Sequence, residues 1–164
     1  MLDDHDSRPM AAQLSMWADH LPPVAAEVVA TSDRTRPHVY AHLPAEPGQA
    51  TVARRQIAQW ATRIGLPDVL TQDITLAADE ALSNAIEHAY RDSAGTFVLF
   101  AACAASSRAA RVIVTDHGHW QPPAADPGFR GRGLTMMNRL SDVFHLVHTG
   151  NGTTVVLGWT LPAG

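Results

Sequence analysis

The chain has 164 residues, a formal net charge of −4 at pH 7 and a hydrophobic content of 46%. This length suits one domain, and it is sufficient to bury a core without help from metals or disulfides. The acidic balance and the lack of a Lys/Arg block argue against direct contact with nucleic acid. No apolar run approaches the roughly 20 residues that cross a bilayer, so we expect no membrane contact.

The amino terminus and the cysteine content indicate where the protein works. The first residues, MLDDHDSRPM, are acidic and lack the cationic and apolar regions of a signal peptide. Cys103 is the only cysteine, which excludes an internal disulfide and fits a reducing compartment. We therefore expect a cytoplasmic protein.

Residues 1–37 form an expected amino-terminal extension. Its stretches RP, LPP and TSDRTRP interrupt regular structure. Met10, Leu14, Trp17 and Leu21 recur at helical spacing, which predicts a short amphipathic helix within a partly flexible segment. This helix could dock on its own domain or bind a partner, and the pattern leaves both hypotheses open.

A regular pattern begins at residue 38, where we expect the main domain, 38–164, to start. The stretch HVYAHLPAE indicates an edge strand. The stretch QATVARRQIAQWATRIG then predicts a helix that stops at Gly65. A second helix is expected from about Asp68 to Tyr90.

The second half of the chain alternates strands with loops. TFVLFAACA and ARVIVTD are expected strands joined by the hairpin turn ASSRA, and a Pro-rich loop leads to a short helix starting near Leu134. The stretches VFHLVHT and TTVVLGWTL flank the turn GNG as a terminal hairpin. This order predicts an α+β fold, a two-layer sandwich whose helices cover one face of a mixed, mostly antiparallel sheet.

The stretch DEALSNAIEHAY carries several polar side chains on one expected helix. At 100° per residue the apolar residues collect on one side, and Asp73, Glu80, Asn84 and Glu87 fall on the other. Glu80 and Asn84 are four residues apart, so their side chains are neighbours. Taken alone, the pattern is typical of a solvated helix face.

Two further stretches have the chemistry of a ligand site. In VIVTDHG, a strand ends at Asp116, which can accept a hydrogen bond from an exocyclic amine, and Gly118 lets a flat ring approach. In GNGTTVVLGW, Thr154 lies near the start of the last strand, where its hydroxyl could face a ligand. Each stretch is also ordinary turn or strand chemistry.

The stretch GFRGRGL is a candidate phosphate site. Gly131 and Gly133 open the expected helix, whose free N–H groups and dipole attract phosphate. Arg130 and Arg132 could add positive charge. A plain helix-entry turn is the simpler interpretation of the same residues.

The order of these stretches resembles the motif sequence of the histidine-kinase-type ATPases, a superfamily that includes gyrase-type and mismatch-repair ATPases. DEALSNAIEHAY, a short lid and GRGLTMMNRLSD are similar to the bacterial anti-sigma-factor serine kinases of the stress-response and sporulation type. The resemblance covers roughly residues 38–161. It implies the Bergerat ATP-binding fold and ATP with Mg²⁺ as cofactors.

The resemblance also implies a role for each matched residue. Asn84 is expected to bind Mg²⁺, and Glu80 to act as the general base on a serine hydroxyl. Asp116 is expected to read adenine with Gly118 beside the ring, and Thr154 to complete the adenine pocket. The residues expected at the phosphates are Arg130, Gly131, Arg132, Gly133 and Leu134.

The function that this resemblance implies is an ATP-dependent protein serine kinase that is also an anti-sigma factor. Such proteins act as homodimers, sequester a sigma factor and phosphorylate an anti-anti-sigma protein of the STAS type. Trp120 stands where many relatives have a second glycine, and the lid is short and lacks lysine. These departures favour the alternative of a nucleotide-binding module that sequesters a partner without catalysis.

A metal-dependent hydrolase is a hypothesis from a different class. The stretch DHGH offers Asp116, His117 and His119 as ligands. Adjacent residues of a strand alternate between its faces, and no HExxH motif accompanies these residues. We therefore expect no resident metal from this set.

Overall fold

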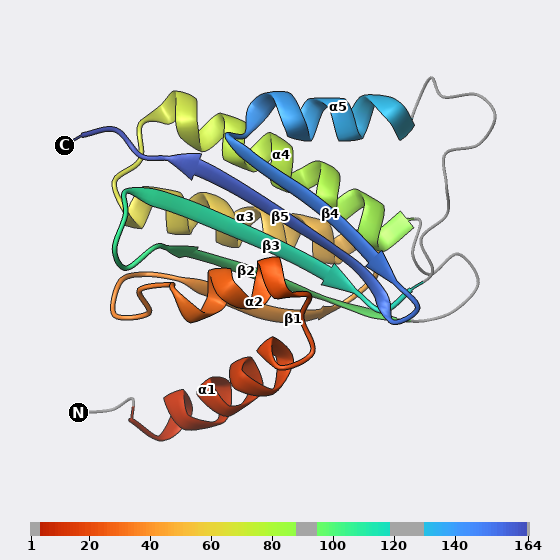
Figure 1. Ribbon diagram of the computed structural model, residues 1–164, viewed down its shortest axis with the longest axis horizontal. Helices are drawn as coiled ribbons and strands as arrows, with labels where there is room; N and C mark the ends of the chain where they lie inside the picture. Colours follow the sequence, from red (N-terminus) through yellow and green to blue (C-terminus); the bar gives the residue numbers. More distant parts are fainter. Residues whose placement is uncertain (1–3, 88–94, 119–129, 164) are drawn as a thin grey trace.

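The computed structural model describes residues 4–87, 95–118 and 130–163. Figure 1 shows the elements in chain order within these ranges. They are α1 (Asp4–Ala18), α2 (Pro23–Ala30), β1 (Val39–Pro44), α3 (Pro47–Arg63), α4 (Asp68–Glu87), β2 (Thr96–Cys103), β3 (Ala109–Asp116), α5 (Arg130–Leu140), β4 (Val143–Thr149) and β5 (Gly152–Thr160).

The strands form one five-stranded sheet in the order β1-β2-β3-β5-β4. Each described pairing is antiparallel, so the sheet is not mixed as the sequence suggested. β1 lies at an edge, as predicted. In the central pair, Asp116 of β3 lies opposite Thr153 of β5, and Thr115 lies opposite Thr154.

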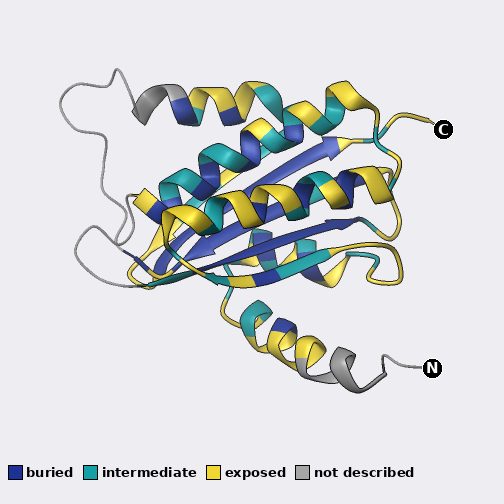
Figure 2. Ribbon diagram, turned by 180° about the vertical axis from the view of Figure 1, so that it is seen from behind, coloured by how far each residue is buried: buried dark blue, intermediate teal, exposed yellow. Residues whose placement is uncertain are grey.

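Helices α3, α4 and α5 cover one face of the sheet, which we call the front face (Figure 2). The predicted two-layer α+β arrangement is therefore confirmed. α4 presents small buried side chains, among them Ala78, Ala81 and Ala85, and small side chains let a helix approach a sheet closely. The larger residues of this front cluster include Ile57, Trp60, Ile74, Leu82, Phe97, Leu99, Met137 and Leu157.

The amino-terminal extension packs on the opposite face, which we call the rear face. Leu14 of α1 and Val29 of α2 join Phe100, Ile113 and Val156 of the sheet in a second apolar cluster. The extension thus contains two helices instead of one. The second begins at Pro23, directly after the N-cap residue Pro22, because proline is favoured at the first position of a helix. The structure agrees with docking on the chain's own domain.

Helix boundaries differ from the sequence prediction at two places. α5 begins at Arg130, four residues before Leu134, so Gly131 and Gly133 belong to its first turn. Glycine is unfavourable inside a helix, but it is tolerated in the first turn, where the free backbone N–H groups can bind a ligand. α4 is described to Glu87, and its predicted continuation to Tyr90 lies outside the described residues.

Among the described helices, a span that is both long and apolar enough for a bilayer is absent.

Substitution in α1 tests whether the extension belongs to the cooperative fold. Leu14 is 3% exposed and Met16, on the same helix, is 67% exposed. We expect Leu14→Ala to lower the free energy of unfolding by about 2–3 kcal/mol, because it removes buried methyl groups from the rear cluster. Met16→Ala should change it by less than about 0.5 kcal/mol.

Urea unfolding monitored by circular dichroism measures both variants. Equal, negligible effects of Leu14→Ala and Met16→Ala would contradict the prediction, because the extension would then unfold independently of the sheet.

Candidate functional site

The polar residues of α4 lie under the start of α5. Glu80 and Asn84 are both half-buried, whereas the neighbouring Ala81 and Ala85 are buried in the front cluster. Both side chains are therefore more enclosed than those of a fully exposed helix face.

The first turn of α5 approaches Glu80 closely. A Cβ atom added at Gly133 would lie 2.7 Å from Oε2 of Glu80, so a larger residue would displace the carboxylate. The first four N–H groups of a helix have no acceptor within it, and here they include those of Gly131 and Gly133. The fold thus brings together a carboxylate and a helix amino terminus, which can attract an anionic group.

The carboxyl group of Glu80 has a raised pKa. Burial is the main cause, and the negative charges of Asp79 and Glu87 raise the pKa further. Asp79 itself pairs with Arg54 of α3, whose Nη2 lies 2.5 Å from Oδ1 of Asp79. This ion pair joins α3 to α4 next to Glu80, and the sequence patterns did not indicate it.

Asp116 lies at the end of β3 and is 8% exposed. Its Oδ1 accepts a hydrogen bond from the N–H of Gly118 at 3.0 Å. Burial raises the pKa of Asp116 to about 6, although backbone hydrogen bonds from Gly118 and Thr153 and the charge of His117 act in the opposite direction. An ionised carboxylate in this position gains from any further donor, such as the amine of a base.

The two threonines that open β5 face opposite sides of the sheet. Val155 belongs to the front cluster and Val156 to the rear cluster, so alternation puts Thr153 on the front face and Thr154 on the rear face. Val114 belongs to the front cluster, which places Asp116 on the front as well. Thr153, and not the predicted Thr154, is therefore the neighbour of Asp116.

Gly152 fixes the end of β5 against the end of β3. Its φ of +137° is unfavourable for other residues, and an added Cβ would lie 1.9 Å from the carbonyl oxygen of Asp116. The turn sequence GNG contains this residue, but its spacing alone does not reveal the close contact. Gly152 is thus a structural requirement of the site that sequence analysis missed.

The remaining predicted residues have mixed outcomes. Leu134 is half-buried and packs on the front cluster, so its side chain serves the core. The side chains of Arg130 and Arg132, and the residues His119 and Trp120, lie outside the described residues. Their predicted roles stay predictions.

The described part of the chain contains no group of three or more His, Cys, Asp or Glu residues that could hold a metal ion. His117 is exposed, and its Nδ1 lies 3.3 Å from the carbonyl oxygen of Asn151. The described residues therefore offer no support for a hydrolase with a protein-held metal.

Comparison with known proteins places the chain in a family. Residues 43–159 match the histidine kinase-like ATPase domain. The chain belongs to this family. Its α+β fold is that of a histidine kinase-like ATPase domain, and the family implies ATP binding.

Two solved structures illustrate the similarity of fold. The crystal structure of the RsbU and RsbW domains of Rv1364c from Mycobacterium tuberculosis is 31% identical with a TM-score of 0.63, and the match covers 76% of this chain and 32% of that one. The histidine kinase domain of a blue-light-activated histidine kinase from Erythrobacter litoralis is 23% identical with a TM-score of 0.52, covering 66% of this chain and 61% of that one. The chain thus spans about a third of the length of the first relative.

The buried carboxyl of Asp116 gives stability a distinctive pH dependence. Its pKa is about 6 in the folded chain, whereas an unfolded aspartate titrates near 4. The folded state therefore binds the proton more tightly, and this contribution to stability is complete below about pH 4 and lost as the pH rises through about 6. Asp116→Asn removes the contribution, so the stability of the wild type relative to this variant should fall by about 2–3 kcal/mol between about pH 4 and pH 7.5.

Urea unfolding across that pH range measures the difference, and Asp19→Asn at an exposed position is the matched control. If the difference in unfolding free energy between the wild type and Asp116→Asn did not change with pH, the raised pKa of Asp116 would be contradicted.

The two threonines of β5 give a second prediction. Thr153→Val should weaken ATP binding about threefold to tenfold, because it removes one hydroxyl beside Asp116 and keeps the side-chain shape. Thr154→Val, on the rear face, should leave the affinity within about twofold of the wild type. Isothermal titration with ATP compares the two, and the opposite ranking would restore the assignment made from the sequence.

Proposed function

We propose that this chain is an ATP-dependent protein serine kinase that also sequesters a sigma factor and phosphorylates an anti-anti-sigma protein of the STAS type. The observation that carries the proposal is the contact between Glu80 and the first turn of α5 at Gly133. A carboxylate beside a helix amino terminus puts a proton acceptor next to a site where phosphates bind well.

ATP would lie across the front site. Asp116 would accept a hydrogen bond from the exocyclic amine of adenine, and Thr153 lies opposite it. The phosphates would lie at the amino terminus of α5. Asn84 would supply a carboxamide oxygen to Mg²⁺, and a neutral ligand fits because the triphosphate itself supplies anionic oxygens.

Magnesium, when bound with ATP, neutralises charge that develops on the transferred phosphoryl group. The chain's own contribution is the proton acceptor. Glu80 would orient the serine hydroxyl and accept its proton while the serine oxygen bonds to the γ-phosphorus and ADP leaves. The raised pKa of Glu80 increases its proton affinity, which suits a general base near neutral pH.

Sequence likeness supports the choice of partners. DEALSNAIEHAY and GRGLTMMNRLSD resemble anti-sigma-factor serine kinases, and the Rv1364c structure that is 31% identical contains an RsbW domain. We further propose that the protein is a cytoplasmic homodimer. Residues 38–164 would form its ATP-binding domain, and residues 1–37 would form an extension to it.

A second candidate keeps the fold and the nucleotide but omits catalysis. Trp120 replaces an expected glycine next to the lid, and this substitution favours a module that sequesters a partner without phosphoryl transfer. Both candidates require ATP binding, so one experiment in two stages separates them.

Titration with labelled ATP tests the binding stage. We expect micromolar affinity that depends on Mg²⁺ and falls at least about tenfold in Asn84→Ala, because the metal loses its protein ligand. Asn138→Ala, at an exposed position of α5, is the matched control and should bind as the wild type does. Absence of ATP binding by the wild type would refute both candidates.

Transfer of label from γ-labelled ATP to a purified STAS protein tests the catalytic stage. We expect Glu80→Gln to slow transfer by about 10²-fold or more and to leave ATP affinity nearly unchanged, because it removes the base and keeps the side-chain size. Glu27→Gln, at an exposed position of α2, should transfer at the wild-type rate. ATP binding without transfer by the wild type would favour the non-catalytic module.

A further inference from the structure

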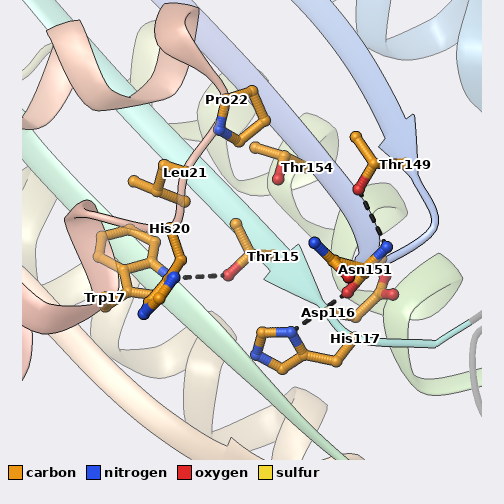
Figure 3. Close-up of a pocket in the computed structure, with 11 residues that line it drawn as sticks. Trp17, His20, Leu21, Pro22, Thr115, Asp116, His117, Thr149, Asn151 and Thr154 are labelled. Atoms are coloured by element: carbon orange, nitrogen blue, oxygen red, sulfur yellow. Dashed lines mark hydrogen bonds between the residues drawn. The ribbon is translucent and has the colours of Figure 1, made fainter.

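A pocket of about 550 Å³ opens between the extension and the ends of β3 and β5. Figure 3 shows that Trp17 and Leu21 of the extension form one side, and that Thr149 and Asn151 near the β4–β5 turn form the other. The rear-face threonines line it as well. Its volume lies within the range that holds small ligands.

The floor of the pocket is the cross-strand pair of Thr115 and Thr154. These residues are 4% and 6% exposed, and they continue the rear-face rows that contain Ile113 and Val156. The rear face thus changes from apolar to hydroxyl-bearing beyond the point where the extension packs. Burial of a hydroxyl is unfavourable unless it finds a hydrogen-bond partner.

Only one of the two threonine hydroxyls accepts a hydrogen bond from the protein. Oγ1 of Thr115 accepts a hydrogen bond from Nε1 of Trp17 at 3.0 Å, which leaves its own hydrogen available. Within the described ranges the hydroxyl of Thr154 forms no hydrogen bond. In the same ranges, every fully buried side-chain nitrogen or oxygen atom has a hydrogen-bond partner. The small exposed area of Thr154 must therefore include its hydroxyl, and Figure 3 shows this group pointing to the side where Thr115 and Asn151 lie.

The charge of the lining restricts the class of ligand. The lining given by the described part of the chain contains no lysine or arginine, so the imidazoles of His20 and His117 are its only groups that can carry a positive charge. A phosphate or carboxylate would therefore meet no permanent counterion there. Asp116 also borders it, but its carboxylate accepts a hydrogen bond from Gly118 and alternation places it on the front face. The other polar and aromatic groups of the lining are the indole of Trp17, the imidazoles of His20 and His117, three threonine hydroxyls and the amide of Asn151. Flat rings with neutral donors and acceptors suit a neutral ligand.

We propose that this pocket binds a small, uncharged, planar heterocycle. Its flat face would lie against Trp17 and Leu21, and its acceptor atoms would take hydrogen bonds from the hydroxyls of Thr115 and Thr154. The pocket is separate from the front site, because the two use opposite faces of the same strand ends. The proposal therefore does not depend on ATP binding or on phosphoryl transfer.

Methyl NMR of threonine-labelled full-length protein tests this proposal, with caffeine, nicotinamide and uracil as neutral planar probes. We expect at least one probe, at millimolar concentration, to shift the methyl signals of Thr115 and Thr154 more than that of Thr153 on the front face. The shifts should persist with the front site saturated by ATP. Inorganic phosphate, as a small anion, should leave the rear-face signals unchanged.

Matched variants on β5 complete the test. Thr154→Val should weaken binding of the active probe about threefold to tenfold by removing one hydroxyl. Thr160→Val, at the exposed end of the same strand, should not change it. The remaining methyl signals report whether each variant keeps the fold.

Three results would overturn the proposal. The first is that no probe shifts the rear-face methyl signals. The second is that probe binding is the same in Thr154→Val and in the wild type, or is abolished by ATP. The third is that phosphate shifts these signals and the neutral probes do not.

Discussion

The pairing of β3 with β5 is the constraint on which both sites depend. Gly152 allows the first residue of β5 to pack against the carbonyl of Asp116, at a distance that any Cβ would prevent. This contact sets the register, which places Asp116 opposite Thr153 on the front face and Thr115 opposite Thr154 on the rear face. A shift of one residue would exchange the two faces and remove both pairs.

Small residues have a comparable role in the layer above the sheet. Ala81 and Ala85 let α4 approach the strands, and Gly133 lets the first turn of α5 approach Glu80. The carboxylate is half-buried as a result, which is the physical origin of its raised pKa. Thus the alanine-rich composition of α4, together with one glycine of α5, determines the electrostatics of the front site.

The sequence predicted those features that a single element determines. The helical period of α4, the hairpin patterns and the turn GNG were sufficient to predict the α+β fold. They also placed Glu80 and Asn84 on one helix and Asp116 at the end of a strand. Features that depend on contact between elements could not be predicted. β5 is buried on both faces from Gly152 to Trp159, so its apolar pattern does not show whether Thr153 or Thr154 faces the front. The rear cluster likewise depends on the contact between the extension and the sheet. The helical spacing in the extension predicted a helix there, but it did not distinguish docking on the sheet from binding of a partner.

The electrostatics of the front site also favour a ligand that brings donors and cations. Glu80 and Asp116 both have raised pKa values, and in each case burial is the largest cause. The ionised forms are therefore poorly solvated by the protein alone. An exocyclic amine at Asp116 would add a hydrogen bond to the ionised form and lower that pKa. The same burial that costs stability near neutral pH thus makes the carboxylate a stronger acceptor for a bound base, which is the usual exchange of stability for function at a binding site.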